Sequence, residues 1–231
     1  MLQCFGEEIW IADGPTVSIA GFVYPTRMVV IRLKDGSLFI WSPTQISDEI
    51  QSAVDRLGSV RHIVAPNALH HLFIGEWQAA YPSAKYHAAP NLRTKRPDLK
   101  WDSELGDIPS AEWADDIDQV VVRGNRITTE VVFFHRLSRT AIFTDLIQNF
   151  EPGWFKGWRA LAARMDLMIA PQPTVPRKFR MAFHDRDLAR VAVHRIMAWP
   201  SENVLAAHCP PVTHDGQSVI AHAFAWLQLA Q

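Results

Sequence analysis

The sequence predicts an α/β fold in which two β-rich halves carry helices on their outer sides. Short β-branched and aromatic runs alternate with helical patterns along the chain. Of the 231 residues, 48% are hydrophobic and 20% charged, as in an ordinary globular protein. No internal repeat or low-complexity linker marks a domain boundary. We therefore expect residues 1–231 to form one domain, with a core large enough to fold without a disulfide or a metal.

The first half predicts a β-meander followed by a β-α-β unit. The Asp35-Gly36 pair between two apolar runs is a strong hairpin signal. Ser47 and the acidic residues after it are typical of the start of a helix, and Gly58 is typical of the position just past its end. The expected elements are strands Glu8–Ala12, Met28–Leu33, Leu38–Trp41, Val60–Val64 and Lys85–Ala88, and helices Asp48–Leu57 and Leu72–Tyr81.

The second half predicts another sheet after an irregular stretch, 91–116, that is rich in Pro, Asp and Trp. Three consecutive antiparallel strands are expected at Gln119–Arg123, Thr129–His135 and Thr140–Thr144. Beyond these strands, helical patterns again alternate with short apolar runs. It predicts helices Phe155–Arg164, Asp185–Ala198 and Gln217–Leu229, and strands Asp166–Ile169 and Asn203–Ala207.

Charge and cysteine content favour a cytoplasmic protein that acts on a small molecule. The net charge is −1 and the basic residues are dispersed, apart from the cluster at 177–180, which argues against nucleic acid as a partner. Cys4 and Cys209 are too far apart in sequence for a CxxC site, and Glu7 and Glu8 interrupt any leader-like run. No uncharged apolar stretch approaches the roughly 18–20 residues of a membrane span.

Titratable side chains stand where the predicted strands end. His70 and His71 lie in the turn after a buried strand, where neighbouring side chains can converge as they cannot within a strand. His135, Asp145 and His208 each close a later apolar run. Imidazole and carboxylate groups suit zinc, iron or manganese, so these residues are candidate ligands of one divalent metal ion.

The order of features along the chain resembles that of the metallo-β-lactamase superfamily: a β-meander, then a His-rich turn, then single His, Asp and His residues at later strand ends. Its H-x-H-x-D-H signature falls on 66–71, with Pro66 and Ala68 in place of the first two histidines. His70 then stands at the Asp position and His71 at the last His. By the same resemblance the later ligands match His135, Asp145 and His208.

The resemblance is to a divergent branch known as a domain of unknown function. In the superfamily an early strand normally ends in an Asp-x-Gly turn, and this chain has Ser42 and Pro43 at that place. The implied fold is a four-layer αβ/βα sandwich. The half-site that normally uses the first two histidines would keep only His135 and the shared Asp145, too few ligands for tight binding.

The other half-site implies a mononuclear centre. His70, His71, Asp145 and His208 would hold one ion, zinc foremost, which would supply hydroxide near neutral pH while Asp145 orients the nucleophile. The predicted activity is hydrolysis of an ester, thioester, lactone or phosphoester. Two alternatives stay open: a non-catalytic binding protein whose polar residues only hydrogen-bond one another, and a mononuclear iron redox protein.

Side chains for substrate binding are predicted from charge and spacing. Trp154 and Trp158 would share one helix face as a lid, or else belong to the core. Arg139 or Arg177, or Lys178 beside it, would hold an anionic group. The alternative for the 177–180 cluster is a solvated basic loop.

Overall fold

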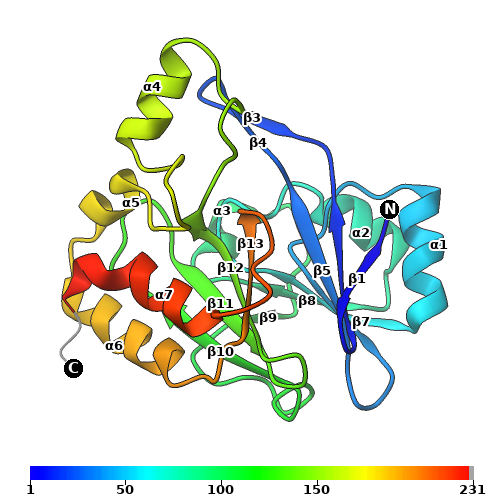
Figure 1. Cartoon of the computed structure of the whole chain (residues 1–231). Coiled ribbons are helices and arrows are strands. Elements are labelled where there is room, and N and C mark those ends of the chain that lie inside the picture. Colours follow the sequence, from blue (N-terminus) through cyan, green and yellow to red (C-terminus); the bar gives the residue numbers. More distant parts are fainter. Residues whose placement is uncertain (229–231) are drawn as a thin grey trace.

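Two mixed β-sheets pack face to face in the computed structural model, which describes residues 1–228 (Figure 1). The first sheet has the order β1-β2-β5-β6-β7-β8-β9 and the second the order β10-β11-β12-β13. Helices lie on the outer face of each sheet, so the predicted four-layer αβ/βα sandwich is confirmed.

The strands of the first sheet are β1 (Gln3–Gly6), β2 (Ile9–Asp13), β5 (Arg27–Arg32), β6 (Leu38–Trp41), β7 (Val60–Ala65), β8 (Lys85–Ala88) and β9 (Ser103–Glu104). Those of the second are β10 (Ile117–Val122), β11 (Glu130–His135), β12 (Thr140–Gln148) and β13 (Asn203–His208). A separate hairpin consists of β3 (Val17–Ile19) and β4 (Phe22–Tyr24).

The helices are α1 (Asp48–Leu57), α2 (Ile74–Ala80), α3 (Leu92–Lys95), α4 (Trp158–Met165), α5 (Arg177–Ala182), α6 (Arg186–Met197) and α7 (Gly216–Phe224), and α7 continues as a 3₁₀ turn, Ala225–Leu227. Helix α1 begins as predicted, because the Ser47 hydroxyl accepts a hydrogen bond from the backbone N–H of Ile50. Among the helices of residues 1–228, none combines the length and the apolar character needed to cross a bilayer.

Three apolar layers hold the sandwich together. Between the sheets, Trp41 and Phe39 of β6 pack with Phe133 of β11 and Leu205 of β13. Outside the first sheet, α1 and α2 bury side chains such as Trp77. The outer face of the second sheet is covered by α5, α6 and α7. Burial on both faces explains why the central strands are continuous apolar runs without alternation.

Several expectations from the sequence need correction. Residues 166–169 form a turn instead of a strand, because Leu167 has a φ of +62°. The stretch 91–116 contains α3 and β9, and the expected basic loop at 177–180 is part of α5. Strands β1, β3 and β4 were not predicted. The last residue of the predicted helix Gln217–Leu229 lies outside the described residues.

The architecture brings chain segments far apart in sequence to one edge. Strands β12 and β13 are parallel, so both end at the same edge of their sheet. The loop after β7 reaches the same place, because the backbone N–H of Val131 in β11 donates to the carbonyl of Pro66. The β3–β4 hairpin and α4 stand above this edge, at the top of the view in Figure 1.

Candidate metal centre

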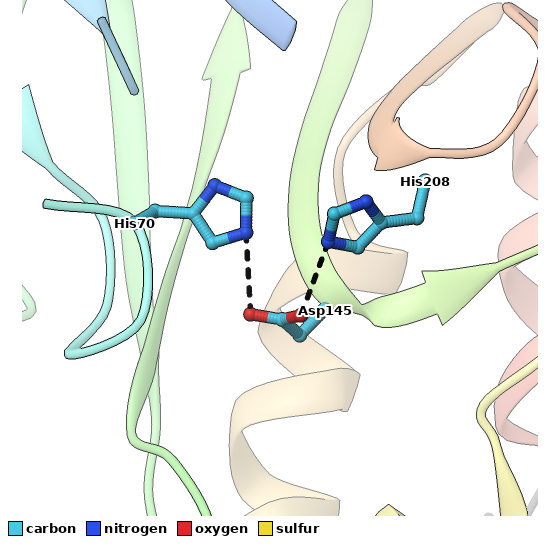
Figure 2. Close-up of side chains that lie close together, drawn as sticks. All are labelled: His70, Asp145 and His208. Carbon is cyan, nitrogen blue, oxygen red and sulfur yellow. Dashed lines mark ion pairs between the residues drawn. The ribbon is translucent and has the colours of Figure 1, made fainter. Parts of the chain in front are cut away.

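His70, Asp145 and His208 converge at this edge (Figure 2). Nε2 of His70 lies 3.4 Å from Oδ2 of Asp145, and Nε2 of His208 lies 3.3 Å from Oδ1 of the same carboxylate. One donor atom from each of the three residues falls within 4.8 Å of the other two. All three side chains are at least nine-tenths buried. Within residues 1–228 no other three His, Cys, Asp or Glu side chains come together closely enough to hold a metal ion.

The turn that carries His70 is organised by Asn67. The Asn67 side-chain oxygen accepts hydrogen bonds from the backbone N–H groups of Leu69 and His70, an Asx-type turn that fits an Asn just after a strand. Its amide nitrogen donates to Oδ2 of Asp145 at 2.6 Å and to the Thr144 hydroxyl at 2.9 Å. Because Asn67 is fully buried, this side chain fixes the turn relative to β12.

The backbone around Asp145 is held by Glu130, the first residue of β11. One Glu130 oxygen accepts from the N–H of Thr144, and the other accepts from the N–H groups of Asp145 and Leu146. The pairing of β12 with β13 shifts register between Phe143 and Gln148, and Glu130 takes up N–H groups that lie in that irregular stretch. Burial, and next the negative charge of Asp145, raise the Glu130 pKa to about 6.

The electrostatics of the cluster favour a charged Asp145 carboxylate beside a neutral His208 imidazole. Burial works against ionisation of Asp145, but the close approach of His70 and His208 holds its pKa well below the usual range. Burial lowers the pKa of His208, although Asp145 opposes this. A neutral imidazole next to an ionised carboxylate is the protonation state in which both groups can bind a cation.

Ser42 gives His70 a partner on its second ring nitrogen. The Ser42 hydroxyl lies 2.9 Å from Nδ1 of His70. When Nδ1 donates to this oxygen, the lone pair of Nε2 faces the cluster, which is how metal-bound histidines are usually oriented. Nδ1 of His208 is buried and has no hydrogen-bond partner among residues 1–228.

His71 lies beside the cluster but is not part of it. Its Nδ1 faces the Arg96 guanidinium at 2.9 Å and must accept that hydrogen bond, because guanidinium only donates. Burial, together with the positive charges of Lys95 and Arg96, lowers the His71 pKa to about 4. The resemblance placed His71 among the ligands. His70 was predicted beside it, and the structure brings only His70 into the cluster and leaves His71 as a neutral residue of the pocket wall.

His135 and Arg139 lie at the other end of the second sheet. Strands β11 and β12 are antiparallel and His135 pairs with Thr140, so the end of β11 meets the start of β12 and not Asp145 near its end. Nδ1 of His135 is bonded to the Ser138 hydroxyl at 2.7 Å. Arg139 forms an ion pair with Glu202. The structure therefore brings neither residue to the cluster.

Arg177 and Trp154, which were also predicted as binding residues, lie outside the pocket wall. Arg177 donates to the carbonyl of Met165. The Trp154 side chain is 41% exposed, and its Nε1 donates to the carbonyl of Val23 in the β3–β4 hairpin. Lys178, next to Arg177, does line the pocket.

A cavity of about 520 Å³ opens above the cluster. Asp145 and both cluster histidines form part of its lining, and most of the rest comes from the β3–β4 hairpin, the loop around His71 and the segments of α4 and α5. The volume falls in the range of small-molecule sites.

Three residues of the site were not anticipated from the sequence: Ser42, Asn67 and Glu130. The Pro66-Asn67 pair after a buried strand is a turn signal that could have drawn attention to Asn67. Glu130 could have been found as a carboxylate that begins an otherwise apolar strand antiparallel to the one ending near Asp145.

Metallo-β-lactamases are among the solved structures that match this architecture, so the fold is that of the metallo-β-lactamases. The enzyme from Pontibacter korlensis has a TM-score of 0.67 and 12% identity, covering 100% of this chain and 99% of its own. The enzyme from Hirschia baltica has a TM-score of 0.65 and 14% identity, covering 100% and 98%. FIM-1 from Pseudomonas aeruginosa in its mono-zinc form has a TM-score of 0.63 and 11% identity, covering 100% and 96%.

Within that fold the chain belongs to the family described as a domain of unknown function, DUF4336, whose model matches residues 6–153. None of the curated proteins matches the sequence significantly. At these identities the solved structures establish the fold alone.

Proposed function

We propose that this protein is a metal-dependent hydrolase that binds one divalent ion through His70, Asp145 and His208. The convergence of these three buried side chains carries the proposal. Two imidazoles and one carboxylate are a common ligand set of catalytic zinc sites, which leave a position open for water or substrate. The hydrogen bonds of His70 to Ser42 and of Asp145 to Asn67 supply the outer partners that such ligands need.

The chemistry divides between the ion and the side chains around it. A bound divalent ion would lower the pKa of a water molecule to near neutrality and polarise a scissile carbonyl group. Asp145, held ionised, can accept a hydrogen bond from the attacking water and orient it. The pocket would exclude bulk water around the scissile bond, and Asn67 and Glu130 would keep the carboxylate in place.

Elemental analysis of untagged protein tests the metal assignment. We expect about one equivalent of zinc, iron or manganese in the wild type and its loss in His208→Ala. His71→Ala is the matched control, because it removes an adjacent buried imidazole that faces Arg96 and should keep the metal. Loss in His71→Ala with retention in His208→Ala would contradict the ligand set. A screen of ester, thioester, lactone and phosphoester substrates on the loaded protein then tests hydrolysis.

One observation favours a second candidate, a metal-free binding protein. Asp145 already receives contacts from both cluster histidines and from Asn67, so its carboxylate oxygens have polar partners without an ion. Metal-free protein that stays metal-free after reconstitution with zinc, iron and manganese would favour this candidate over the hydrolase.

A further inference from the structure

The walls of the cavity above His70, Asp145 and His208 are predominantly apolar. Phe22 of β4 and Phe73 before α2 line it, as do Met168 and Phe179 from the segments after α4. We call these walls, together with the residues of the mouth described next, the acyl pocket. An apolar cavity that ends at polar catalytic groups is suited to a ligand with one apolar and one reactive end.

The apolar surface continues outward to the mouth of the cavity. Ile19 of the hairpin, Leu72 and Ile127 line the cavity and are also 44–52% exposed. Large apolar side chains left in water at the edge of a concave site commonly mark a binding surface. The acyl pocket therefore offers a continuous apolar path from solvent to the cluster.

A single lysine stands at the inner, polar end of this path. Nζ of Lys178 lies 3.1 Å from the Tyr24 hydroxyl and 3.5 Å from Oδ2 of Asp166. The Tyr24 ring is in turn 5.2 Å from the ring of His208. Because Lys178 is already paired with Asp166, the inner end suits a carbonyl or one carboxylate better than a multiply charged phosphoester.

We propose that the acyl pocket takes esters or thioesters of apolar carboxylic acids, with the acyl chain against its walls and the carbonyl group between the cluster and Lys178. The hydrolytic part rests on the proposed function. In that step the water oxygen bonds to the acyl carbon, the bond to the alcohol oxygen or thiol sulfur breaks, and the leaving group takes up a proton. The products are the carboxylic acid and the free alcohol or thiol.

Calorimetric titration with butanoate, hexanoate, octanoate and decanoate tests the pocket without relying on turnover. Affinity should rise about fourfold for each added methylene until the cavity is filled, because each buried methylene contributes about 0.8 kcal/mol. The measurement is made on metal-free protein. An affinity that does not change with chain length would overturn the proposal.

Matched variants assign the binding to this pocket. Leu72→Asp should weaken octanoate binding at least tenfold, whereas Leu137→Asp should leave it unchanged. Leu72 and Leu137 are both 52% exposed, but Leu137 is in the turn after β11, away from the cavity. Circular dichroism checks that both variants are folded. Equal octanoate binding by Leu72→Asp and Leu137→Asp would refute the assignment. Lys178→Met should weaken the binding of octanoate but not that of 1-octanol. An equal loss of affinity for both would show that Lys178 does not hold the carbonyl end of the ligand.

The two proposals fail in different ways. Chain-length-dependent binding in a protein that hydrolyses no ester or thioester would leave the acyl pocket standing and reject the hydrolase. Hydrolysis of p-nitrophenyl acetate and p-nitrophenyl octanoate with the same kcat/KM would keep the hydrolase and reject the acyl pocket.

Discussion

The side-chain amide of Asn67 donates a 2.6 Å hydrogen bond to Oδ2 of Asp145. The same side chain accepts from the backbone N–H of His70, so one buried residue joins the loop that carries one cluster member to the strand that carries another. Both roles need an amide: a carboxylate could accept from the loop but could not donate to Asp145. Asn67 thus couples two segments 78 residues apart in sequence.

Replacing Asn67 with alanine should separate these segments. We expect the free energy of unfolding to fall by about 1–3 kcal/mol, because the variant leaves the backbone N–H groups of Leu69 and His70 without partners and removes a donor to Asp145. If the cluster holds a metal, its affinity should fall roughly 10- to 100-fold, as for other outer-shell partners. Urea denaturation and a zinc competition titration measure the two effects. Asn203→Ala is the control, since Asn203 bonds the carbonyl of Ser138 at the opposite end of the sheet; an equal loss of zinc affinity there would contradict the coupling.

Replacing Glu130 with glutamine tests the support beneath Asp145. Both carboxylate oxygens accept backbone N–H groups, so the amide of glutamine would turn an N–H donor toward at least one of them. We expect a loss of about 1–3 kcal/mol in the free energy of unfolding. Equilibrium denaturation at pH 7 measures it, with the exposed Glu104→Gln as the control. Stability equal to the wild type would show that the backbone near Asp145 holds without the carboxylate.

The fold was predictable because periodicity and turn residues are local signals. The runs at Met28–Leu33 and Leu38–Trp41 and the Asp35-Gly36 turn predict a hairpin, and β5 and β6 pair antiparallel there. The turn at Leu167 carries no such signal, because its left-handed backbone is adopted by a leucine where glycine or asparagine would be expected. The apolar residues beside it therefore predicted a strand that does not exist.

The site was predictable only in part, because a motif fixes order along the chain and not direction in space. His208 ends β13 and Asp145 lies near the end of β12, its parallel neighbour, so reading strand ends placed them together. His135 also ends a strand, but an antiparallel one, and that strand reaches the site through its first residue, Glu130. Both His70 and His71 were predicted as ligands, and separating them needed the Asx turn at Asn67, which the family signature does not contain.

Trp154 should act on the β3–β4 hairpin from outside the pocket. Its indole N–H donates to the Val23 carbonyl, and its ring lies beside Phe150. Trp154→Phe keeps an aromatic ring and removes the hydrogen bond, so we expect faster amide exchange in residues 17–24, by a few-fold, with little change in the melting temperature. Hydrogen–deuterium exchange read by mass spectrometry measures this. Exchange that rises equally in β10–β13 would show instead that the residue supports the whole fold.

The pH dependence of stability should report His135, which lies away from the cluster. Burial lowers its pKa to about 4, against 6.5 in an unfolded chain. Between these values the unfolded chain binds a proton that the folded protein excludes, so the contribution of His135 to stability is complete above pH 6.5 and is lost as the pH falls toward 4. It amounts to about 2 kcal/mol by pH 5.

His135→Gln should therefore lose less stability than the wild type between pH 7 and pH 5, by about this amount. Some acid sensitivity should remain, because burial also lowers the pKa values of His62 and His87 to about 4. Urea denaturation at both pH values gives the difference, and the exposed His194→Gln should follow the wild type. Parallel pH curves for His135→Gln and the wild type would mean that folding leaves the pKa of His135 unchanged, which the burial of this side chain argues against.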